Sequence, residues 1–256
     1  MRYLTVAHTD VGIRKKVNQD AFCLYTASSG PKKIVFAAVC DGMGGLKLGE
    51  LASAFLLNAF SGWFEKVFPE DLKQGCDFGL ISEQWGDIVQ KQNELIRDYG
   101  SGQGVALGTT LTAMLICDGD FAAVHVGDSR LYRINKSIEQ LTEDHSLVAL
   151  EVKQGKLTPE QARTDRRGNV LLQCVGASPT VEPQFLTGKA EENDVFMLCS
   201  DGFRHKLTED ELLGVLAPEL LNDERIMRKT VVDLINLNKS RGETDNITSV
   251  LIKCVE

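Results

Sequence analysis

Three short stretches of this sequence share one form, an apolar run that ends in an aspartate. VFAAVCDGMGG (residues 35–45) and VFMLCSDGF (195–203) place the acid before a glycine, and AAVHVGDSR (122–130) is a close relative. Apolar runs of this length predict strands that are buried on both faces. A glycine after the acid lets the backbone come close to an ion, because no side chain stands in the way. Three strands that end in this way predict one site that collects carboxylates.

The composition limits the class of protein. The chain has 256 residues, of which 43% are hydrophobic and 25% charged, and we interpret residues 1–256 as one globular domain. A net charge of −8 disfavours binding to nucleic acid or to an anionic membrane. Neither a signal peptide nor an apolar run of about 18 residues is expected. The seven cysteines include no CxxC pair, which predicts reduced thiols in a cytoplasmic protein.

Hydrophobic periodicity predicts a mixture of short strands and helices. Tight turns such as Asp118-Gly119 are too short for parallel crossovers, so the strands around them are expected to be antiparallel. Pro69 is expected to end the first helix, and the glycine-rich residues 100–108 are expected to form no regular structure. The predicted strands are 6–9, 21–26, 34–40, 109–117, 121–126, 130–135, 137–141, 195–199 and 247–255, and the predicted helices are 49–68, 81–99, 158–164, 208–216 and 223–240.

Further aspartates stand at predicted strand ends. Asp41 and Asp201 end apolar runs, Asp20 precedes the second strand, and Asp245 precedes the last strand. Magnesium and manganese prefer oxygen ligands and keep several waters, so a few convergent carboxylates are enough to hold them. A single Asp-Gly pair is mainly a turn signal, which is our interpretation of Asp118-Gly119. The hypothesis of a metal site therefore depends on the whole set of motifs.

Taken together, the motifs resemble those of the metal-dependent serine/threonine protein phosphatases of the 2C type, in their compact bacterial form. The resemblance runs from HTDVG to TDNITSVLI, with GTTLTAMLI, LTEDHSLV and LLQCVGASPTVEP in between. It implies an α+β fold, a four-layer αββα sandwich in which two central antiparallel β-sheets are flanked by helices. The implied activity is hydrolysis of phosphoserine and phosphothreonine in proteins, opposing a bacterial Ser/Thr protein kinase.

The resemblance also implies roles for individual residues. Asp41 would bridge two ions of Mn2+ or Mg2+, and the carbonyl of Gly42 would complete one of them. Asp201 and Asp245 would hold the other ion, and Asp20 would act through metal-bound water. A hydroxide that bridges the two ions would attack phosphorus directly, which makes Asp41 and Asp201 catalytic as well as ligands.

Two further roles are implied at the edges of this site. Asp128, together with Asp201, resembles a third and weaker metal position of bacterial members. The phosphate-binding arginine of the family falls here on Lys15, with Arg14 beside it. Lysine supplies charge but no bidentate fork, and we expect Lys15 or Arg14 to contact the substrate phosphate.

Other motif residues depart from the family or carry a structural interpretation. Gln19 stands where many relatives have glutamate, and Met43 stands where animal relatives have a histidine proposed as general acid. His145 is interpreted as structural, and the remaining histidines as packing or surface residues. The segment from about 149 to 173 resembles the flap that lies beside the active site in this family. Asn246 is expected to orient the adjacent loop or to be a simple turn residue.

Two other functions are compatible with parts of the sequence. A catalytically inactive pseudophosphatase that binds phosphoproteins would have lost a core ligand, whereas Asp41, Asp201 and Asp245 are all present. A dinucleotide-binding enzyme would explain a strand followed by DGMGG and a helix. The glycine spacing is not GxGxxG, however, and the short turns between 109 and 141 do not suit a parallel doubly wound sheet.

Overall fold

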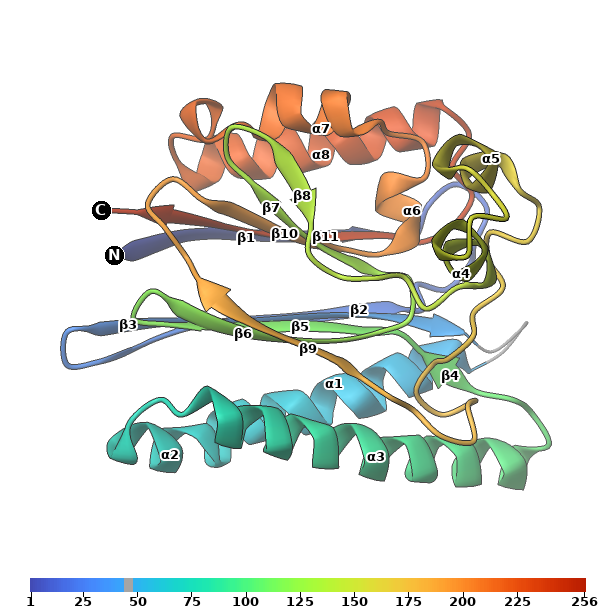
Figure 1. Ribbon diagram of the computed structural model, residues 1–256, viewed down its shortest axis with the longest axis horizontal. Helices are drawn as coiled ribbons and strands as arrows, with labels where there is room; N and C mark the ends of the chain where they lie inside the picture. Colours follow the sequence, from blue (N-terminus) through green and yellow to red (C-terminus); the bar gives the residue numbers. More distant parts are fainter. Residues whose placement is uncertain (44–47) are drawn as a thin grey trace.

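Two antiparallel sheets stack face to face between layers of helices in the computed structural model, which describes residues 1–43 and 48–256 (Figure 1). Sheet one runs in the order β1 (Arg2–Asp10), β11 (Ile247–Val255), β10 (Val195–Cys199), β7 (Arg130–Ile134) and β8 (Ile138–Gln140). Sheet two runs in the order β2 (Asp20–Ser29), β3 (Lys32–Met43), β5 (Leu111–Cys117), β6 (Asp120–Val126) and β9 (Gln184–Lys189), with β4 (Gly108–Thr109) beside the end of β3. The predicted four-layer α+β sandwich is confirmed.

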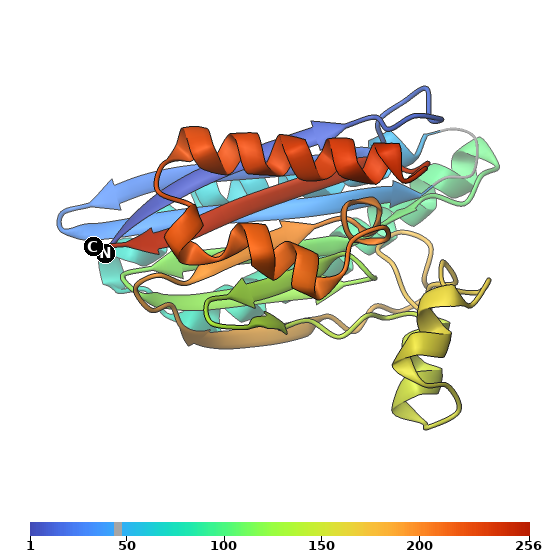
Figure 2. The same cartoon turned by 90° about the horizontal axis from the view of Figure 1, so that it is seen from above.

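Helices cover the outer face of each sheet (Figure 1). Sheet two is covered by α1 (Gly49–Lys66), α2 (Phe68–Gln74) and α3 (Phe78–Gln103). Sheet one is covered by α6 (Asp201–Arg204), α7 (Glu209–Leu216), the 3-10 helix η1 (Pro218–Leu220) and α8 (Glu224–Ser240). The short helices α4 (Leu147–Lys153) and α5 (Pro159–Thr164) project beside one end of the sandwich (Figure 2). In the part of the chain that the structure describes, none of the helices has the length and apolarity that a membrane crossing requires.

Strand β3 shows why the first apolar run has no polar face. Its even-numbered residues, such as Phe36, belong to the core under α1–α3, and its odd-numbered residues, such as Val35 and Val39, belong to the core between the sheets. This alternation follows from the two-residue period of a strand. Asp41 continues the odd-numbered series, so its side chain points toward the space between the sheets.

Several predicted element boundaries are wrong. Helix α3 continues through the glycine-rich segment to Gln103 and ends at Gly104, which adopts the left-handed conformation typical of a helix end. Gly100 suits this packing because a Cβ there would lie 2.7 Å from the Val105 carbonyl oxygen. Pro69 does not end the first helix; it occupies the first turn of α2, where a missing N–H costs little. Strand β9 was not predicted at all.

The apolar face predicted for α1 is only partly right. The sequence suggests the series 51, 55, 59, 63 and 67, of which Trp63 is buried, but Phe55 is 42% exposed and the other buried side chains include Leu56, Phe60 and Phe64. The reason is that apolar residues occur on both sides of this helix. Phe55 instead makes an edge-to-face contact with Tyr99 of α3, with ring centroids 5.7 Å apart.

Candidate active site

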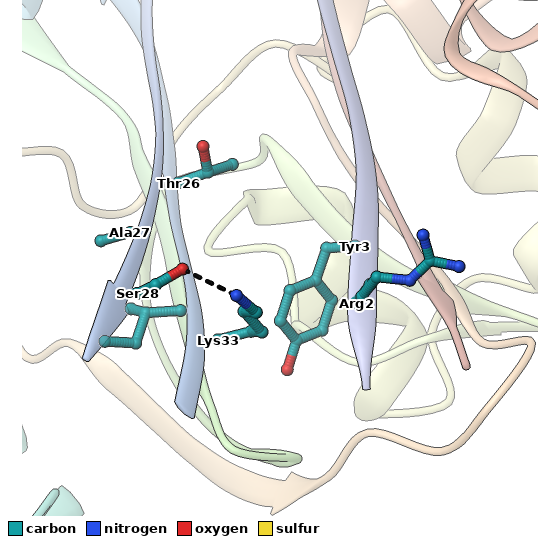
Figure 3. A pocket seen from close by; sticks show the side chains of 7 residues that line it. Arg2, Tyr3, Thr26, Ala27, Ser28 and Lys33 are labelled. Atoms are coloured by element: carbon teal, nitrogen blue, oxygen red, sulfur yellow. Dashed lines mark hydrogen bonds between the residues drawn. The ribbon is translucent and has the colours of Figure 1, made fainter. Parts of the chain in front are cut away.

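A hollow of about 210 Å³ opens at the end of the sandwich where β3 and β10 end and β11 begins. We call it the acidic hollow. A larger hollow of about 280 Å³ lies at the opposite end of the sheets, beside Tyr3 and Lys33, and its lining contains no acid (Figure 3). The smaller hollow, which is lined by acids, is therefore the candidate active site. The acidic hollow is lined by Lys15, Gln19, Asp41, Gly42, Met43, Asp128, Asn169, Leu171, Asp201 and Asp245.

Both sheets deliver carboxylates to this end. Asp20 opens β2 and lies directly opposite Asp41 of β3 in the antiparallel register. Asp201 opens α6 immediately after β10, and Asp245 precedes β11. Asp128 lies in the turn between β6 of sheet two and β7 of sheet one. The structure thus brings together at one end of the sandwich all five aspartates that the sequence singled out.

Hydroxyl groups that the sequence analysis missed hold two of these aspartates in place. The Asp41 backbone N–H donates to Thr110 Oγ1 at 2.9 Å, and its carbonyl oxygen accepts from the Thr110 N–H at 2.9 Å. Ser200 Oγ donates to Asp20 Oδ2 at 2.8 Å, which links the two sheets. The sequence offered only one indication of these two hydroxyl groups, which is that both belong to motifs already singled out. Ser200 directly precedes Asp201, and Thr110 lies within GTTLTAMLI.

Two glycines are required by close backbone packing around the aspartates. A Cβ on Gly42 would lie 2.2 Å from the Gly49 carbonyl oxygen and 2.6 Å from that of Gln19. A Cβ on Gly202 would lie 2.1 Å from the Asn246 carbonyl oxygen. The glycine after each motif aspartate therefore permits the strand ends to approach one another. Gly44 and Gly45 of the first motif lie outside the described residues.

The electrostatics of the acidic hollow fit a bound cation. Burial, together with repulsion from neighbouring carboxylates, raises the pKa values of Asp20, Asp41 and Asp128. The Oδ1 atoms of Asp20 and Asp201 are buried and have no hydrogen-bond partner among residues 1–43 and 48–256, an arrangement that is costly unless a positive group satisfies them. Among the described residues, no three His, Cys, Asp or Glu side chains form a closed ligand cluster. A magnesium-like ion that keeps several waters does not need one.

A basic loop borders the acidic hollow and is fixed by Asn246. Asn246 Oδ1 accepts from the Gln19 N–H at 2.9 Å, and its amide nitrogen donates to the Val11 carbonyl at 2.9 Å. The prediction that Asn246 orients the adjacent loop is thereby confirmed. Lys15 Nζ lies 2.7 Å from Asp245 Oδ1. Of these described loop residues, Lys15 lines the acidic hollow, whereas Arg14 is exposed and does not.

The histidines divide into structural and site residues. His125 is buried against the Thr112 hydroxyl and the Gly127 carbonyl, and His145 Nδ1 accepts from the Gly127 N–H at 3.2 Å. Both agree with the structural interpretation. His205 is exposed, in agreement with its interpretation as a surface residue, but its ring nitrogens lie 3.5 Å from Asp201 Oδ2 and 3.6 Å from Glu243 Oε2. The spacing of residues in the sequence did not predict these contacts, since α6 is only one turn long.

Comparison with known proteins identifies the family. The model of the protein phosphatase 2C family matches residues 11–238. The chain belongs to the protein phosphatase 2C family. Protein phosphatase PhpP of Streptococcus pneumoniae is 30% identical over 251 residues, which cover 97% of this chain and 96% of that protein. A serine/threonine phosphatase of S. agalactiae superposes with a TM-score of 0.86 at 30% identity and covers 99% of this chain and 100% of its own.

A third relative has been solved with bound metal ions. The catalytic domain of the phosphatase PstP, solved in complex with two manganese ions, has a TM-score of 0.79 at 26% identity, with 99% of each chain covered. This 2C-type phosphatase is accordingly a metal-dependent serine/threonine phosphoprotein phosphatase. The dinucleotide-binding alternative is wrong, because both central sheets are antiparallel.

Proposed function

We propose that this phosphatase hydrolyses phosphoserine and phosphothreonine monoesters with two Mn2+ or Mg2+ ions held by Asp20, Asp41, Asp201 and Asp245, together with the Gly42 carbonyl. The observation that carries the proposal is the convergence of carboxylates from both sheets, with two buried oxygens that have no partner in the described part of the chain. The manganese complex of the PstP catalytic domain supports the choice of ion. When bound, the ions would supply a water nucleophile of lowered pKa and would offset charge on the phosphoryl group.

The residues of the chain have distinct tasks in this proposal. Asp41, fixed by Thr110, presents its carboxylate to the space between the sheets, and Ser200 fixes the orientation of Asp20. No cysteine is among the described residues that line the acidic hollow, which supports direct hydrolysis without a covalent phosphoenzyme.

We assign the contact with substrate phosphate to Lys15. Its side chain is 40% exposed and reaches Asp245 from a surface loop, so it can exchange this partner for a phosphate oxygen at little cost. Although burial lowers the pKa of Lys15, the Asp245 carboxylate raises it and the net shift is upward, so the ammonium is charged when substrate binds. Asn169 and Leu171 of the predicted flap border the same hollow and would face the substrate peptide.

The dephosphorylation reaction implies a kinase as a functional partner. A phosphoprotein phosphatase needs a kinase that attaches the phosphate, and we propose a Ser/Thr protein kinase that acts in the same cytoplasmic compartment. All seven cysteines are free thiols, which supports a reducing compartment.

Metal-dependent hydrolysis tests the proposal. Purified protein would be assayed with p-nitrophenyl phosphate and a phosphothreonine peptide in Mn2+, in Mg2+ and in EDTA. We expect EDTA to abolish release and Asp201→Asn to lower kcat by at least about a hundredfold, with Asp118→Asn, a turn aspartate away from the hollow, as the matched control. No release by folded protein with either metal would contradict the proposal and would favour the pseudophosphatase.

A second comparison tests the phosphate contact. Lys15→Ala should raise the KM for the phosphopeptide about tenfold, as expected for one lost charge-assisted contact. Arg14→Ala is the matched control from the same loop and should leave KM unchanged. If the two variants behave alike, the assignment to Lys15 is wrong.

A further inference from the structure

Asp128 has a cationic neighbour in the chain itself. Arg204, the last residue of α6, places Nη2 4.0 Å from Asp128 Oδ2 and donates from the same nitrogen to the Asp128 carbonyl oxygen at 3.1 Å. The side chains of both residues are largely buried, at 15% and 8% exposed. Asp128 is also one of the two residues at which the family resemblance implies a third ion.

The guanidinium of Arg204 contacts a second carboxylate through the same nitrogen. Its Nη2 lies 3.4 Å from Asp144 Oδ2, so the group is fixed between two carboxylates. Asp144 is itself held by a bidentate pair with Arg130, with both N–O distances at 2.8 Å. Moving Arg204 away from Asp128 would therefore also disturb a buried network.

Arg204 and Arg130 already offset most of the negative charge around Asp128. Asp128, Asp144 and the nearby Asp201 contribute three negative charges, and Arg130 and Arg204 contribute two permanent positive charges. A divalent ion on Asp128 would therefore leave an excess of positive charge in a buried region. The core aspartates differ, because Asp20 retains a buried oxygen without any partner in the described part of the chain.

The pair of Lys15 and Asp245 is a useful contrast within the same site. Lys15 also contacts an aspartate expected to hold an ion, but it is 40% exposed, lies on a loop, and has solvent to move into. Arg204 has two buried carboxylates and a carbonyl oxygen as partners. Only the second arrangement is a fixed competitor for a metal ion.

We propose that Arg204 occupies, at Asp128, the electrostatic role of a third metal ion, so that this phosphatase binds two ions where a third would otherwise be held. The inference rests on the proposed two-ion function of the core site. Repulsion between a guanidinium and a divalent ion about 6 Å apart would weaken binding of that ion at least about tenfold, the value obtained even with the dielectric constant of water, about 80.

Counting bound manganese tests the proposal directly, without an activity measurement. Metal-free protein would be titrated with Mn2+ and the free ion followed by its paramagnetic resonance signal. We expect two ions on the wild type, three on Arg204→Ala, and two again on Arg204→Ala combined with Asp128→Asn. Arg204→Gln, which keeps a hydrogen-bond donor without the charge, should also bind three, and Arg204→Lys should bind two. Arg133→Ala, which breaks an ion pair with Asp194 elsewhere, is the control and should bind two.

The outcomes separate the two proposals. Three ions on the wild type, or two on both the folded Ala and Gln variants, would overturn the role of Arg204 and leave the core site intact. No ion on the folded wild type would contradict the proposed two-ion function itself. Circular dichroism of each variant establishes that it is folded, and Arg204→Gln keeps the test decisive if Arg204→Ala does not fold.

Discussion

His125 makes the stability of this protein sensitive to acid in a calculable way. The side chain is fully buried, and its ring nitrogens contact the Thr112 hydroxyl and the Gly127 carbonyl. Burial, assisted by the nearby His145, lowers the pKa of His125 to about 4. In the unfolded chain the pKa is about 6.5. His125 therefore binds a proton in the unfolded state but not in the folded state, and stability decreases as the pH falls from 6.5 toward 4.

The magnitude follows from this difference in pKa. Between pH 7.5 and pH 4.5, His125 alone should remove about 2.5 kcal/mol from the free energy of unfolding. Urea unfolding of the metal-free protein in EDTA, followed by tryptophan fluorescence, measures it at both pH values. The wild type should lose about 2.5 kcal/mol more than His125→Gln, because glutamine has no proton to bind.

Comparing how much stability each protein loses between pH 7.5 and pH 4.5 decides whether the reasoning holds. His8→Gln, a substitution in β1 of the other sheet, serves as the control and should lose as much stability as the wild type. The subtraction of variants removes the contribution of the carboxylates, which titrate in all three proteins. If His125→Gln and the wild type lose stability equally, within about 0.5 kcal/mol, then His125 is not the group that couples folding to pH.

Three other predictions concern packing. Phe36, whose ring centroid lies 5.1 Å from that of Phe64, is fully buried beneath α1, so Phe36→Ala should cost about 3–5 kcal/mol in urea unfolding and Phe36→Leu clearly less. Gly202→Ala should lower kcat/KM at least about a hundredfold, because its Cβ would displace the Asn246 carbonyl and with it the adjacent aspartates. Gly214→Ala, where nothing lies within 4 Å of the added Cβ on α7, should instead stabilise the protein by about 0.5–1 kcal/mol. An active Gly202→Ala would refute the argument from close packing.

The acids of the site were predictable because their signal is local. Each follows or precedes an apolar strand, and strand ends of a stacked pair of sheets meet at the same edge. The partners of these acids were not predictable. Arg204 and His205 approach their aspartates because a single helical turn forms after β10, and Ser200 reaches Asp20 because the two sheets stack; neither charge nor spacing in the sequence marks these contacts.

The helical layer was predicted less well than the sheets, for a different reason. Strand β3 is apolar on both sides because it is covered on both sides, so its burial could be predicted without deciding which side faces the core. Helix α1 is covered on one side only, yet it carries Phe55 on the other, where the ring contacts Tyr99. A sequence with apolar residues on both faces does not reveal which face the tertiary contacts will bury.

The origin of the acids from two different sheets has a consequence for folding. Asp20 and Asp41 belong to sheet two, whereas Asp201 and Asp245 belong to the ends of strands in sheet one. Neither sheet with its own helices carries all the proposed ligands, and the Ser200–Asp20 hydrogen bond joins the two sheets. With this proposed site, we expect activity to report whether the two sheets are packed together, because a state in which each half stays ordered but the halves separate by a few ångströms would lack a complete set of ligands.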